Sequence, residues 1–359
     1  MTEPDLDTVE LTVITPTFNE GRHVEELLDS LVHQALDVPF EVLVVDGRST
    51  DDTRAKVEAR IRLQETRQAA GERCATVRLL DNEERRTPFA FNIGLTAARG
   101  RYVAILGAHA RYDRNYLQAC LDEVRAAPAR TACGGLVRTV PAGDGLGARL
   151  VVAVLLNPFA SSSRSFRTVT PGPVDSISFP VVGRQQLLDL GGYDERLTRN
   201  QDNDMNERMR RSGVSLRVTG ATGADYVAAA TPGLLLRYAW RNGWWSTRSA
   251  LLASSRMHLR YFVPAAFAAG TVGAAATAVA APAPLLRRVA AVGLGAAWVS
   301  HLAIGSATAR RGATLNGAER ALVPPVIVAF HLAYGFGTIA SLAAFALRWP
   351  MRESAGGIR

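Results

Sequence analysis

Short apolar runs alternate with amphipathic segments over the first two thirds of the chain. Four runs have the pattern of buried strands, at residues 11–15, 41–46, 77–80 and 101–106. A helix with one buried face is predicted between the first two by apolar residues at helical spacing: Val24, Leu27, Leu28, Leu31 and Val32. Repeated strand–helix units predict an α/β fold with a mainly parallel sheet, whose ligands bind at the carboxyl ends of the strands.

The pattern changes after residue 260. Three runs contain no charged residue, at positions 261–283, 289–309 and 321–347. Each reaches the roughly 20 residues that a helix needs to cross a bilayer. We therefore expect three spans, at about 261–283, 289–309 and 323–347. His301 and His331 lie inside these runs, and hydrogen-bonded packing is favoured over a polar path through the membrane. The run 150–156 is too short to span and predicts a core or interfacial helix.

The segment 236–260 interleaves arginine with tryptophan and leucine. If it is helical, its arginines share one broad face, as in a helix at anionic headgroups: Arg237, Arg241, Arg248, Arg256 and Arg260. Trp244 and Trp245 could lie at the interface or stack on an acceptor sugar. No RNA-binding motif accompanies these residues, so no nucleic-acid partner is expected. The arginines before the first span favour a cytoplasmic N-terminal domain, whereas Arg287 and Arg288 in the first loop mildly oppose it.

Composition narrows the class of protein. The chain has 359 residues, of which 48% are hydrophobic and 21% charged, and this excludes a disordered or fibrous protein. The formal net charge is +8, and Lys56 is the sole lysine. Three cysteines without CxxC spacing argue against a disulfide framework and a zinc site. The acidic N-terminus has no apolar core, so no signal peptide is expected.

Polar motifs stand where the predicted strands end. PTFNE (16–20) follows the first strand and DGRSTDDT (46–53) the second, while FNIGLTAARG (91–100) leads into the fourth, which ends in GAHARY (107–112). GGYDERL (191–197) and RNQDNDMNERMRRSG (199–213) come later. No GxGxxG or P-loop motif occurs.

In this order the motifs resemble glycosyltransferase family 2, over about residues 9–250, and especially its membrane-anchored glucosyltransferases of succinoglycan-type assembly. The resemblance implies a GT-A fold, which is a Rossmann-like nucleotide-sugar domain, at residues 1–235. It also implies transfer with inversion at the anomeric carbon and a divalent cofactor, Mg²⁺ or Mn²⁺. An interfacial segment at 236–260 and a transmembrane region at 261–359 would follow.

The resemblance assigns ten residues to nucleotide-sugar binding: Pro16, Thr17, Asn19, Glu20, Asp46, Ser49, Asp51, Arg86, Asn92 and Gly94. Asp46 would read the base, since a carboxylate can accept the N–H of a uracil ring. Ser49 and Asp51 could instead only cap the next helix. Arg86 could pair with a phosphate or remain a solvated surface residue.

The motif at the end of the fourth strand departs from the family. Most relatives have Asp-x-Asp there and the succinoglycan-like branch Asp-Ala-His, whereas this chain has Gly107, Ala108 and His109. His109 is the expected metal ligand, because a neutral imidazole nitrogen can bind a divalent ion; a buried, hydrogen-bonded histidine is the alternative. Gly107 cannot supply a carboxylate, which predicts weaker donor binding or altered metal dependence.

Inverting transfer needs a carboxylate that takes the proton of the acceptor hydroxyl. The resemblance assigns this role to Asp202, at the start of a helix predicted from about Asn203 to Arg211, with Gly213 as its stop. Asp202 could instead merely cap the helix, and Asp204 is the rival base. The acceptor side is expected to include Gln201, Arg208, Trp244 and Trp245.

The leading hypothesis is an inverting glycosyltransferase on the cytoplasmic face of the cell membrane. It would move a hexose, expected to be UDP-linked, to a polyprenyl-diphosphate-linked saccharide. Two alternatives remain: sugar transfer to polyprenyl phosphate itself, and a non-catalytic membrane subunit that binds nucleotide. Gly107 is the reason to keep the second alternative.

Overall fold

The computed structural model describes residues 9–72, 74–108, 110–127, 130–161, 165–252, 259–308 and 315–347. These residues form two compact units. The first unit comprises described residues up to 138 together with 169–226, and the second comprises 139–168 and the described residues from 227 onward. The expected domain boundary at residue 235 lies inside a continuous helix of the second unit, Pro232–Leu252.

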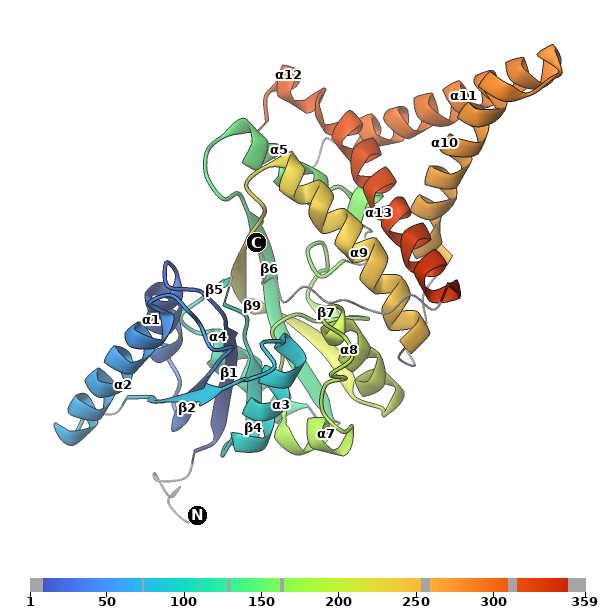
Figure 1. Ribbon diagram of the computed structural model, residues 1–359. Helices are drawn as coiled ribbons and strands as arrows, with labels where there is room; N and C mark the ends of the chain where they lie inside the picture. The colour runs from blue at the N-terminus through green and yellow to red at the C-terminus, as the bar shows by residue number, and fades with distance from the viewer. Residues whose placement is uncertain are drawn as a thin grey trace. The chain divides into compact units, whose positions relative to one another are not determined.

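A mixed β-sheet forms the centre of the first unit (Figure 1). Its order among the described residues is β3-β2-β1-β4-β8-β6-β9-β5, with β7 paired to β9. The strands are β1 (Leu11–Thr17), β2 (Phe40–Asp46), β3 (Thr76–Asp81), β4 (Tyr102–Ile105), β5 (Ala110–Tyr112), β6 (Thr131–Val140), β7 (Gly172–Pro173), β8 (Val181–Gly183) and β9 (Ser215–Val227). The first four coincide with the four predicted strands.

The expectation of a mainly parallel sheet holds for only part of it. β3, β2, β1 and β4 pair in parallel. β8 then pairs antiparallel with β4 and β6, and β9 pairs antiparallel with β5 and β7. Parallel neighbours need a long crossover, which the helices between the first four strands supply. Sequence periodicity identified those crossovers but carried no signal for the direction of the later strands.

Helices cover both faces of this sheet. They are α1 (Val24–Val32), α2 (Thr53–Ala69), α3 (Thr87–Ala97), α4 (Tyr116–Ala126), α7 (Arg184–Asp189) and α8 (Gln201–Arg211). Successive residues of a strand face opposite sides, so β1 sends Val13 into the core under α1, α2 and α4, and Ile14 into the core under α3, α7 and α8. The five apolar residues predicted to line one face of α1 are all buried.

The second unit is helical. It contains α5 (Leu146–Leu155), α6 (Pro158–Ser161), α9 (Pro232–Leu252), the 3₁₀ helix η1 (Leu259–Phe262), α10 (Val263–Ala280), α11 (Pro284–Thr308), α12 (Gly317–Arg320) and α13 (Val323–Ala346). Residues 150–155 of α5 are buried, which favours the core helix over the interfacial helix, the two alternatives predicted for this run. Three helices, α10, α11 and the segment from α12 to the end of α13, are long and apolar enough to cross a membrane.

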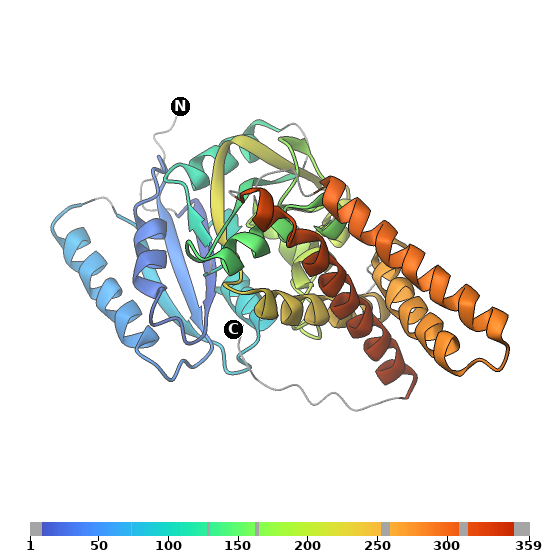
Figure 2. The ribbon, with the colours of Figure 1, turned by 90° about the horizontal axis from the view of Figure 1, so that it is seen from above.

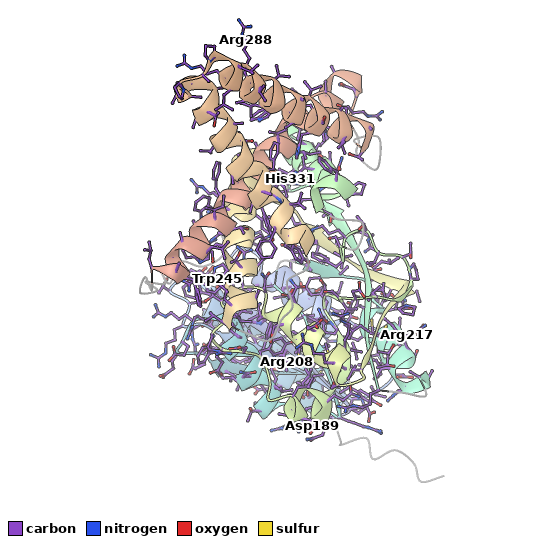
Figure 3. All side chains as sticks on the ribbon, turned by 90° about the vertical axis from the view of Figure 1, so that its right-hand side faces the viewer. Asp189, Arg208, Arg217, Trp245, Arg288 and His331 are labelled. Carbon is purple, nitrogen blue, oxygen red and sulfur yellow. The ribbon has the colours of Figure 1, made fainter. Side chains whose placement is uncertain are left out.

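The apolar helices pack unequally. α10 and α11 form a hairpin, as Figure 2 shows. Most of their apolar residues are exposed, and such surface suits lipid. Arg287 lies inside α11 rather than in the loop before it, and its Nε donates to the Ala281 carbonyl at 2.5 Å. His301 Nε2 and His331 Nδ1 are 2.8 Å apart, so the two histidines hydrogen-bond to each other, in line with the predicted hydrogen-bonded packing. Figure 3 labels His331.

Glycines bring α9 and α13 into backbone contact. A Cβ atom at Gly243 would lie 2.0 Å from the Tyr334 carbonyl oxygen, and one at Gly337 would lie 2.2 Å from the Trp240 carbonyl oxygen. Thr338 Oγ1 donates to the Gly243 carbonyl at 3.4 Å. Small residues permit such an approach between helices in lipid, and here they join α9 to an apolar helix.

Candidate active site

The carboxyl ends of β1, β2 and β3 lie side by side. In the pairing register, Thr17 is opposite Asp46, and Asp46 is opposite Asp81. The half-buried Pro16 is opposite Val45 one step earlier. The loops after β1 and β2 begin at this level, so the sheet brings the first two predicted nucleotide-binding motifs together.

Asp46 is fully buried and joins these two loops. Its Oδ1 accepts hydrogen bonds from Thr17 Oγ1 at 3.1 Å and Ser49 Oγ at 2.6 Å. Its Oδ2 accepts from the Ser49 backbone N–H at 2.9 Å and from Arg54 Nη1 at 3.1 Å. Asp46 therefore holds the ends of β1 and β2 together, and it could read a nucleotide base only by exchanging one of these bonds.

Asn19 fastens the loop after β1 to the loop after β2. Its backbone N–H donates to Ser49 Oγ at 2.8 Å, and its side-chain Oδ1 accepts from the Thr50 N–H at 2.8 Å. Asn19 has a φ of 54°, and Arg48 in the facing loop has a φ of 56°. Both values lie in the left-handed region that few non-glycine residues adopt. The two loops therefore hold each other in a conformation that neither favours alone.

Asp51 extends this connection to the start of α2. Its Oδ2 accepts the Gly21 N–H at 3.0 Å, and its Oδ1 accepts the backbone N–H and the hydroxyl of Thr53. Desolvation raises the pKa of Asp51, but these hydrogen bonds outweigh it and leave the pKa below its ordinary value. The Glu20 N–H donates to Thr53 Oγ1 at 2.8 Å. Asp51 thus bonds to Thr53, the first residue of α2, from the position before the N-cap residue Asp52, whereas Ser49 bonds to Asp46 and Asn19.

The predicted residues on α3 serve its packing. A Cβ atom at Gly94 would lie 2.4 Å from Ile14 Cγ2, so glycine lets α3 pack directly on β1. Arg86 is the N-cap residue of α3, and its guanidinium lies 4.6 Å from the centre of the Phe89 ring. Gly94 therefore contributes through packing, and Arg86 remains a half-buried cation beside the loop after β3.

Asn92 fixes the turn that precedes α8. Its Nδ2 donates to the Tyr193 carbonyl and to Glu195 Oε1, both at 2.9 Å, and its Oδ1 accepts the Tyr193 N–H at 2.7 Å. Gly192 has a φ of 71°, and a Cβ atom there would lie 2.6 Å from Asn92 Oδ1. The amide of Asn92 is therefore committed to protein partners, which assigns it a positioning role.

The same turn is held from its other side by Arg208 of α8 (Figure 3). Arg208 Nη1 donates to the carbonyl oxygens of Leu190 at 2.9 Å and Gly192 at 2.8 Å. Arg208 Nε donates to Asp204 Oδ2 at 2.8 Å, and Asp204 is 2% exposed. The predicted rival base is thus a buried partner of Arg208, with no open access to an acceptor hydroxyl.

Asp202 differs from Asp204 in its exposure and in its hydrogen-bond partners, two properties that decide whether a carboxylate can act as a base. It lies in the first turn of α8, which begins at Gln201 after Asn200 in a left-handed conformation, φ 63°. The Asp202 residue is exposed, yet enough protein surrounds its carboxylate that desolvation raises its pKa above the ordinary value. Its Oδ1 accepts the Asn203 N–H at 2.9 Å. An accessible carboxylate with a raised pKa suits general-base chemistry.

Two buried polar atoms of α8 have no hydrogen-bond partner within the described part of the chain. They are Oε1 of Gln201, an acceptor, and Nη2 of Arg208, a donor. Gln201 directly precedes Asp202, whereas Arg208 follows it by six residues. Each of these two predicted acceptor-side residues thus retains one unused hydrogen-bonding atom.

Gly107 follows β4 beneath an aromatic side chain. A Cβ atom there would lie 3.2 Å from Phe179 Cε1, and the Gly107 carbonyl accepts from the Tyr112 hydroxyl at 2.9 Å. Phe179 has a φ of 55°, and its ring lies 5.4 Å from that of Tyr112. The position thus faces an aromatic ring. His109, the predicted metal ligand, lies outside the described residues.

The described residues do not form a metal site by themselves. They contain no group of three or more His, Cys, Asp or Glu side chains that could hold a metal ion. Magnesium is commonly bound by one or two protein ligands together with substrate phosphates and water.

Trp244 and Trp245, the other predicted acceptor-side residues, belong to α9 in the second unit. Both are half-buried, and Figure 3 places Trp245 on this helix. The ring of Trp244 lies 5.5 Å from the guanidinium carbon of Arg248. The arginines of α9 do not share one solvated face, because Arg237 is exposed and Arg248 is buried. Arg256 lies outside the described residues.

A family model matches most of the first unit up to residue 176, together with residues 139–168 of the second. Residues 12–176 match the model described as Glycosyl transferase family 2. This segment, somewhat less than half of the chain, is a family 2 glycosyltransferase domain. The prediction made from the motifs is therefore confirmed at the level of the domain and its GT-A-like fold.

Two curated relatives and one solved structure resemble the chain. The dolichyl N-acetyl-alpha-D-glucosaminyl phosphate 3-beta-D-2,3-diacetamido-2,3-dideoxy-beta-D-glucuronosyltransferase of Methanococcus voltae is 24% identical over 57% of this chain and 63% of its own length. The succinoglycan biosynthesis protein ExoA of Rhizobium meliloti is 23% identical over 63% of this chain and 66% of its own length. The alignments thus cover less than two thirds of either relative. The mannosyltransferase PcManGT from Pyrobaculum calidifontis, solved in complex with GDP-Man and Mn²⁺, has a TM-score of 0.57 at 21% identity, covering 94% of this chain and 89% of that one.

Three residues that position the family 2 site were not predicted from sequence. Arg54 bonds to both Asp46 and Asp81, Tyr193 packs its ring 4.7 Å from that of Phe91, and Phe179 faces Gly107. Arg54 could have been found, because it directly follows the DGRSTDDT motif in the first turn of α2. Phe179 gave no signal, since its contact depends on a left-handed backbone that glycine or asparagine would normally mark.

Proposed function

We propose that the chain is an inverting glycosyltransferase that moves a hexose from a nucleotide sugar, expected to be UDP-linked, to a lipid-linked saccharide during polysaccharide assembly. The family 2 domain would extend to about residue 235, followed by an interfacial segment at 236–260 and a transmembrane region. The chain would be a multi-pass membrane protein with the family 2 domain on the cytoplasmic face.

The single observation that carries this proposal is the contrast between the two carboxylates of α8. Asp202 is exposed and has a raised pKa, whereas Asp204 is buried and bonded to Arg208. A hydroxyl acceptor must lose a proton as it attacks the anomeric carbon, and Asp202 would take it. Gln201 Oε1 and Arg208 Nη2 would then hold hydroxyl groups of the acceptor sugar.

The donor would bind at the carboxyl ends of β1 and β2. Asp46, Asn19 and Asp51 fix the two loops there, and backbone groups of these loops would contact the nucleotide. Direct contacts from the Asp46 carboxylate are a less favoured reading, because that group already accepts four hydrogen bonds. Preorganised loops lower the entropy cost of binding a flexible diphosphate.

A divalent ion, Mg²⁺ or Mn²⁺, would neutralise the charge that develops on the diphosphate leaving group. His109 would be its protein ligand, and the remaining ligands would come from the diphosphate and water. The replacement His109→Ala should then abolish stimulation by metal. Unchanged dependence of the rate on Mn²⁺ concentration in this variant would remove His109 from the metal site.

Two observations favour a lipid-linked saccharide as acceptor. The second unit has three helices long and apolar enough to cross a membrane. The relative from Methanococcus voltae is named for transfer to a dolichyl-linked sugar phosphate, and the relative from Rhizobium meliloti for succinoglycan biosynthesis. Transfer to polyprenyl phosphate itself is the second candidate, but a phosphate acceptor would not need the base that Asp202 provides.

The test is an assay of the full-length protein in detergent with a panel of UDP- and GDP-sugars, with Mg²⁺ or Mn²⁺, and with or without a lipid-linked saccharide. Release of nucleoside diphosphate and formation of a glycosylated lipid would support the proposal, and the anomeric configuration of the product would test inversion. Binding of nucleotide sugar without hydrolysis or transfer under any condition would instead favour a non-catalytic membrane subunit.

A further inference from the structure

Phe179 adopts a backbone conformation that a large side chain disfavours. Its φ is 55°, in the left-handed region that glycine and asparagine enter most readily. The Tyr116 hydroxyl donates to the Phe179 carbonyl at 2.8 Å. A Cβ atom at Gly134 would lie 2.7 Å from the Ser178 carbonyl oxygen, so glycine in β6 makes room for this backbone. The surrounding residues therefore stabilise an aromatic residue at a position where glycine would fit without strain.

The pairing of β4 with β8 places Phe179 at the carboxyl end of the parallel strands. The Ile105 N–H, at the end of β4, donates to the Pro180 carbonyl at 3.0 Å, and Phe179 directly precedes Pro180. A Cβ atom at Gly107 would lie 3.2 Å from Phe179 Cε1. Because β4 pairs in parallel with β1, and β1 with β2, Phe179 lies at the same edge of the sheet as the loops after β1 and β2.

The ring of Phe179 packs against the core on one side only. Its centre lies 5.4 Å from that of the Tyr112 ring, and the two planes are 88° apart, which is an edge-to-face contact. The Tyr112 hydroxyl donates to the Gly107 carbonyl at 2.9 Å and so fixes the end of β4 beside the ring. Phe179 as a whole is half-buried. Part of this aromatic residue is therefore accessible next to Gly107, where the side chain of a carboxylate is lacking.

The segment that leads to Phe179 is bonded to α8. Asn206 of α8 is buried, and its Nδ2 donates to the Ser176 hydroxyl at 3.0 Å. The Ser176 hydroxyl in turn donates to Asn203 Oδ1 at 3.3 Å. Asn203 directly follows Asp202 in the first turn of α8. The segment of Phe179 thus connects the end of β4 with the helix that carries the proposed base.

An inverting displacement fixes the order of the reacting groups. The acceptor hydroxyl attacks the anomeric carbon opposite the leaving diphosphate, so the transferred sugar lies between the diphosphate and the base. In the proposed function the diphosphate and its metal bind near residues 107–109, and Asp202 is the base. The segment of Phe179 connects these two places, so its ring is suitably located to contact the sugar.

We propose that the ring of Phe179 binds the hexose of the donor by packing against one of its C–H faces. The inference rests on the proposed function and assigns a residue to the sugar part of its donor. The face of an aromatic ring is apolar and electron-rich, which suits the C–H groups that a pyranose presents on one side. A phosphate or the polar edge of a base would instead lose hydrogen bonds to water against this ring without replacing them.

The experiment compares binding of a nucleotide sugar with binding of its nucleoside diphosphate. Calorimetry uses the full-length protein in detergent with Mn²⁺ and without acceptor. The probes are UDP-glucose with UDP, and GDP-mannose with GDP, and the nucleotide sugar that the wild type binds more tightly is used for the variants. Phe179→Leu should weaken binding of this nucleotide sugar by about tenfold, as expected for loss of one aromatic contact. Its affinity for the nucleoside diphosphate should stay unchanged.

Three matched variants separate the ring from the backbone. Phe179→Gly removes the side chain but favours the left-handed backbone, so it should fold and should lose the same part of the affinity. Phe179→Tyr keeps the ring and should retain the wild-type affinity. Phe40→Leu replaces another half-buried phenylalanine, at the start of β2 and thus at the opposite edge of the sheet, and should change neither affinity.

The ratio of the two affinities decides between sugar contact and packing. Equal weakening of nucleotide sugar and nucleoside diphosphate by Phe179→Leu overturns the proposal, because the ring would then act on the nucleotide or on loop shape. An unchanged ratio in Phe179→Leu and Phe179→Gly, with a lower melting temperature, assigns the ring to packing and also overturns it. So does a wild type that binds neither nucleotide sugar more tightly than its nucleoside diphosphate.

The outcome is independent of catalysis. The assay contains no acceptor and no transfer step, so a protein that binds a nucleotide sugar without transferring it would still show the difference that depends on Phe179. Failure of the proposed transfer and failure of the proposed sugar contact are therefore distinguishable.

Discussion

The replacement of Asp202 by asparagine separates catalysis from stability at the start of α8. Asparagine keeps the size of the side chain and can still accept the Asn203 N–H that Asp202 accepts at 2.9 Å. It cannot take a proton from an acceptor hydroxyl. We expect the transfer rate to fall by roughly 10²–10⁴-fold, which is the usual contribution of a general base, while nucleotide-sugar affinity stays unchanged.

Asp204→Asn is the matched control, two residues along the same helix. Asp204 is 2% exposed and accepts the Arg208 Nε–H at 2.8 Å, while Arg208 also holds the turn at Leu190 and Gly192. Loss of the charge turns a charge-assisted hydrogen bond into a neutral one and should lower the free energy of unfolding by ~1–2 kcal/mol. For a domain of this size each kcal/mol corresponds to ~2–4 °C in melting temperature.

The pH dependence gives an independent check of Asp202. Desolvation raises its pKa above 3.8 in the folded state. Only the ionised form is a base, so kcat/KM should rise with pH through this raised pKa and then level off. A raised folded-state pKa also means that the contribution of Asp202 to stability is greatest below its unfolded pKa and is lost as pH rises through the folded pKa. Asp202→Asn should therefore be no less stable than the wild type at neutral pH.

The assay is product formation from a radiolabelled nucleotide sugar and a lipid-linked saccharide, together with thermal unfolding of each variant. We expect a slow but stable Asp202→Asn and a faster but less stable Asp204→Asn. Near-normal transfer by Asp202→Asn, or a larger loss of transfer in Asp204→Asn at unchanged stability, would refute the assignment.

Three further substitutions test the position after β4, the turn before α8 and the packing of α9 on α13. Gly107→Asp should be accommodated by a small movement of the Phe179 ring, which would lie 3.2 Å from the new Cβ, and should tighten donor binding in the presence of Mn²⁺; weaker binding by calorimetry would show that glycine is needed for backbone shape. Asn92→Ala removes three hydrogen bonds to the turn before α8 and should lower the transfer rate and the melting temperature together; a change in donor affinity alone would instead indicate a nucleotide contact. Gly243→Leu places a side chain where a Cβ would be 2.0 Å from the Tyr334 carbonyl, so α9 and α13 cannot pack as they do, and size-exclusion chromatography should show loss of a monodisperse protein.

Periodicity predicted the parallel half of the sheet because a covering helix follows each of its first three strands in the chain. The apolar runs at β1 and β2 and the amphipathic pattern of α1 are local signals, and they identify buried faces directly. The later strands lack such signals. β8 has three residues, and β9 runs through the glycines of residues 215–227, so tertiary pairing rather than local pattern decides their direction.

Motifs predicted which segments surround the site but not what each side chain does there. Sequence placed Asp46 and Asn92 against the nucleotide, whereas the structure shows their polar atoms bonded to Ser49, Thr17, Tyr193 and other protein groups. A motif letter carries no information on whether an oxygen faces a loop or a cleft. The difference in burial between Asp202 and Asp204 likewise depends on how α8 is rotated about its axis. The sequence alone did not show this rotation, and the structure does, with the helix beginning at Gln201.

Most polar side chains of the motifs are therefore used to build the loops, and few remain for a ligand. The side-chain oxygens of Asp46, Asp51 and Asn92 accept hydrogen bonds from backbone and side-chain donors. These hydrogen bonds fix the ends of β1 and β2 and the turn before α8. Rigid loops lower the entropy lost when a flexible donor and acceptor are aligned, and alignment can supply much of the rate enhancement in a displacement. On this view a substitution in Asp46 would act on both substrates through loop geometry, whereas one in Asp202 would act on the proton transfer alone. On this division the proposed transfer would need few unpaired groups, with Asp202 as an accessible carboxylate among the described residues.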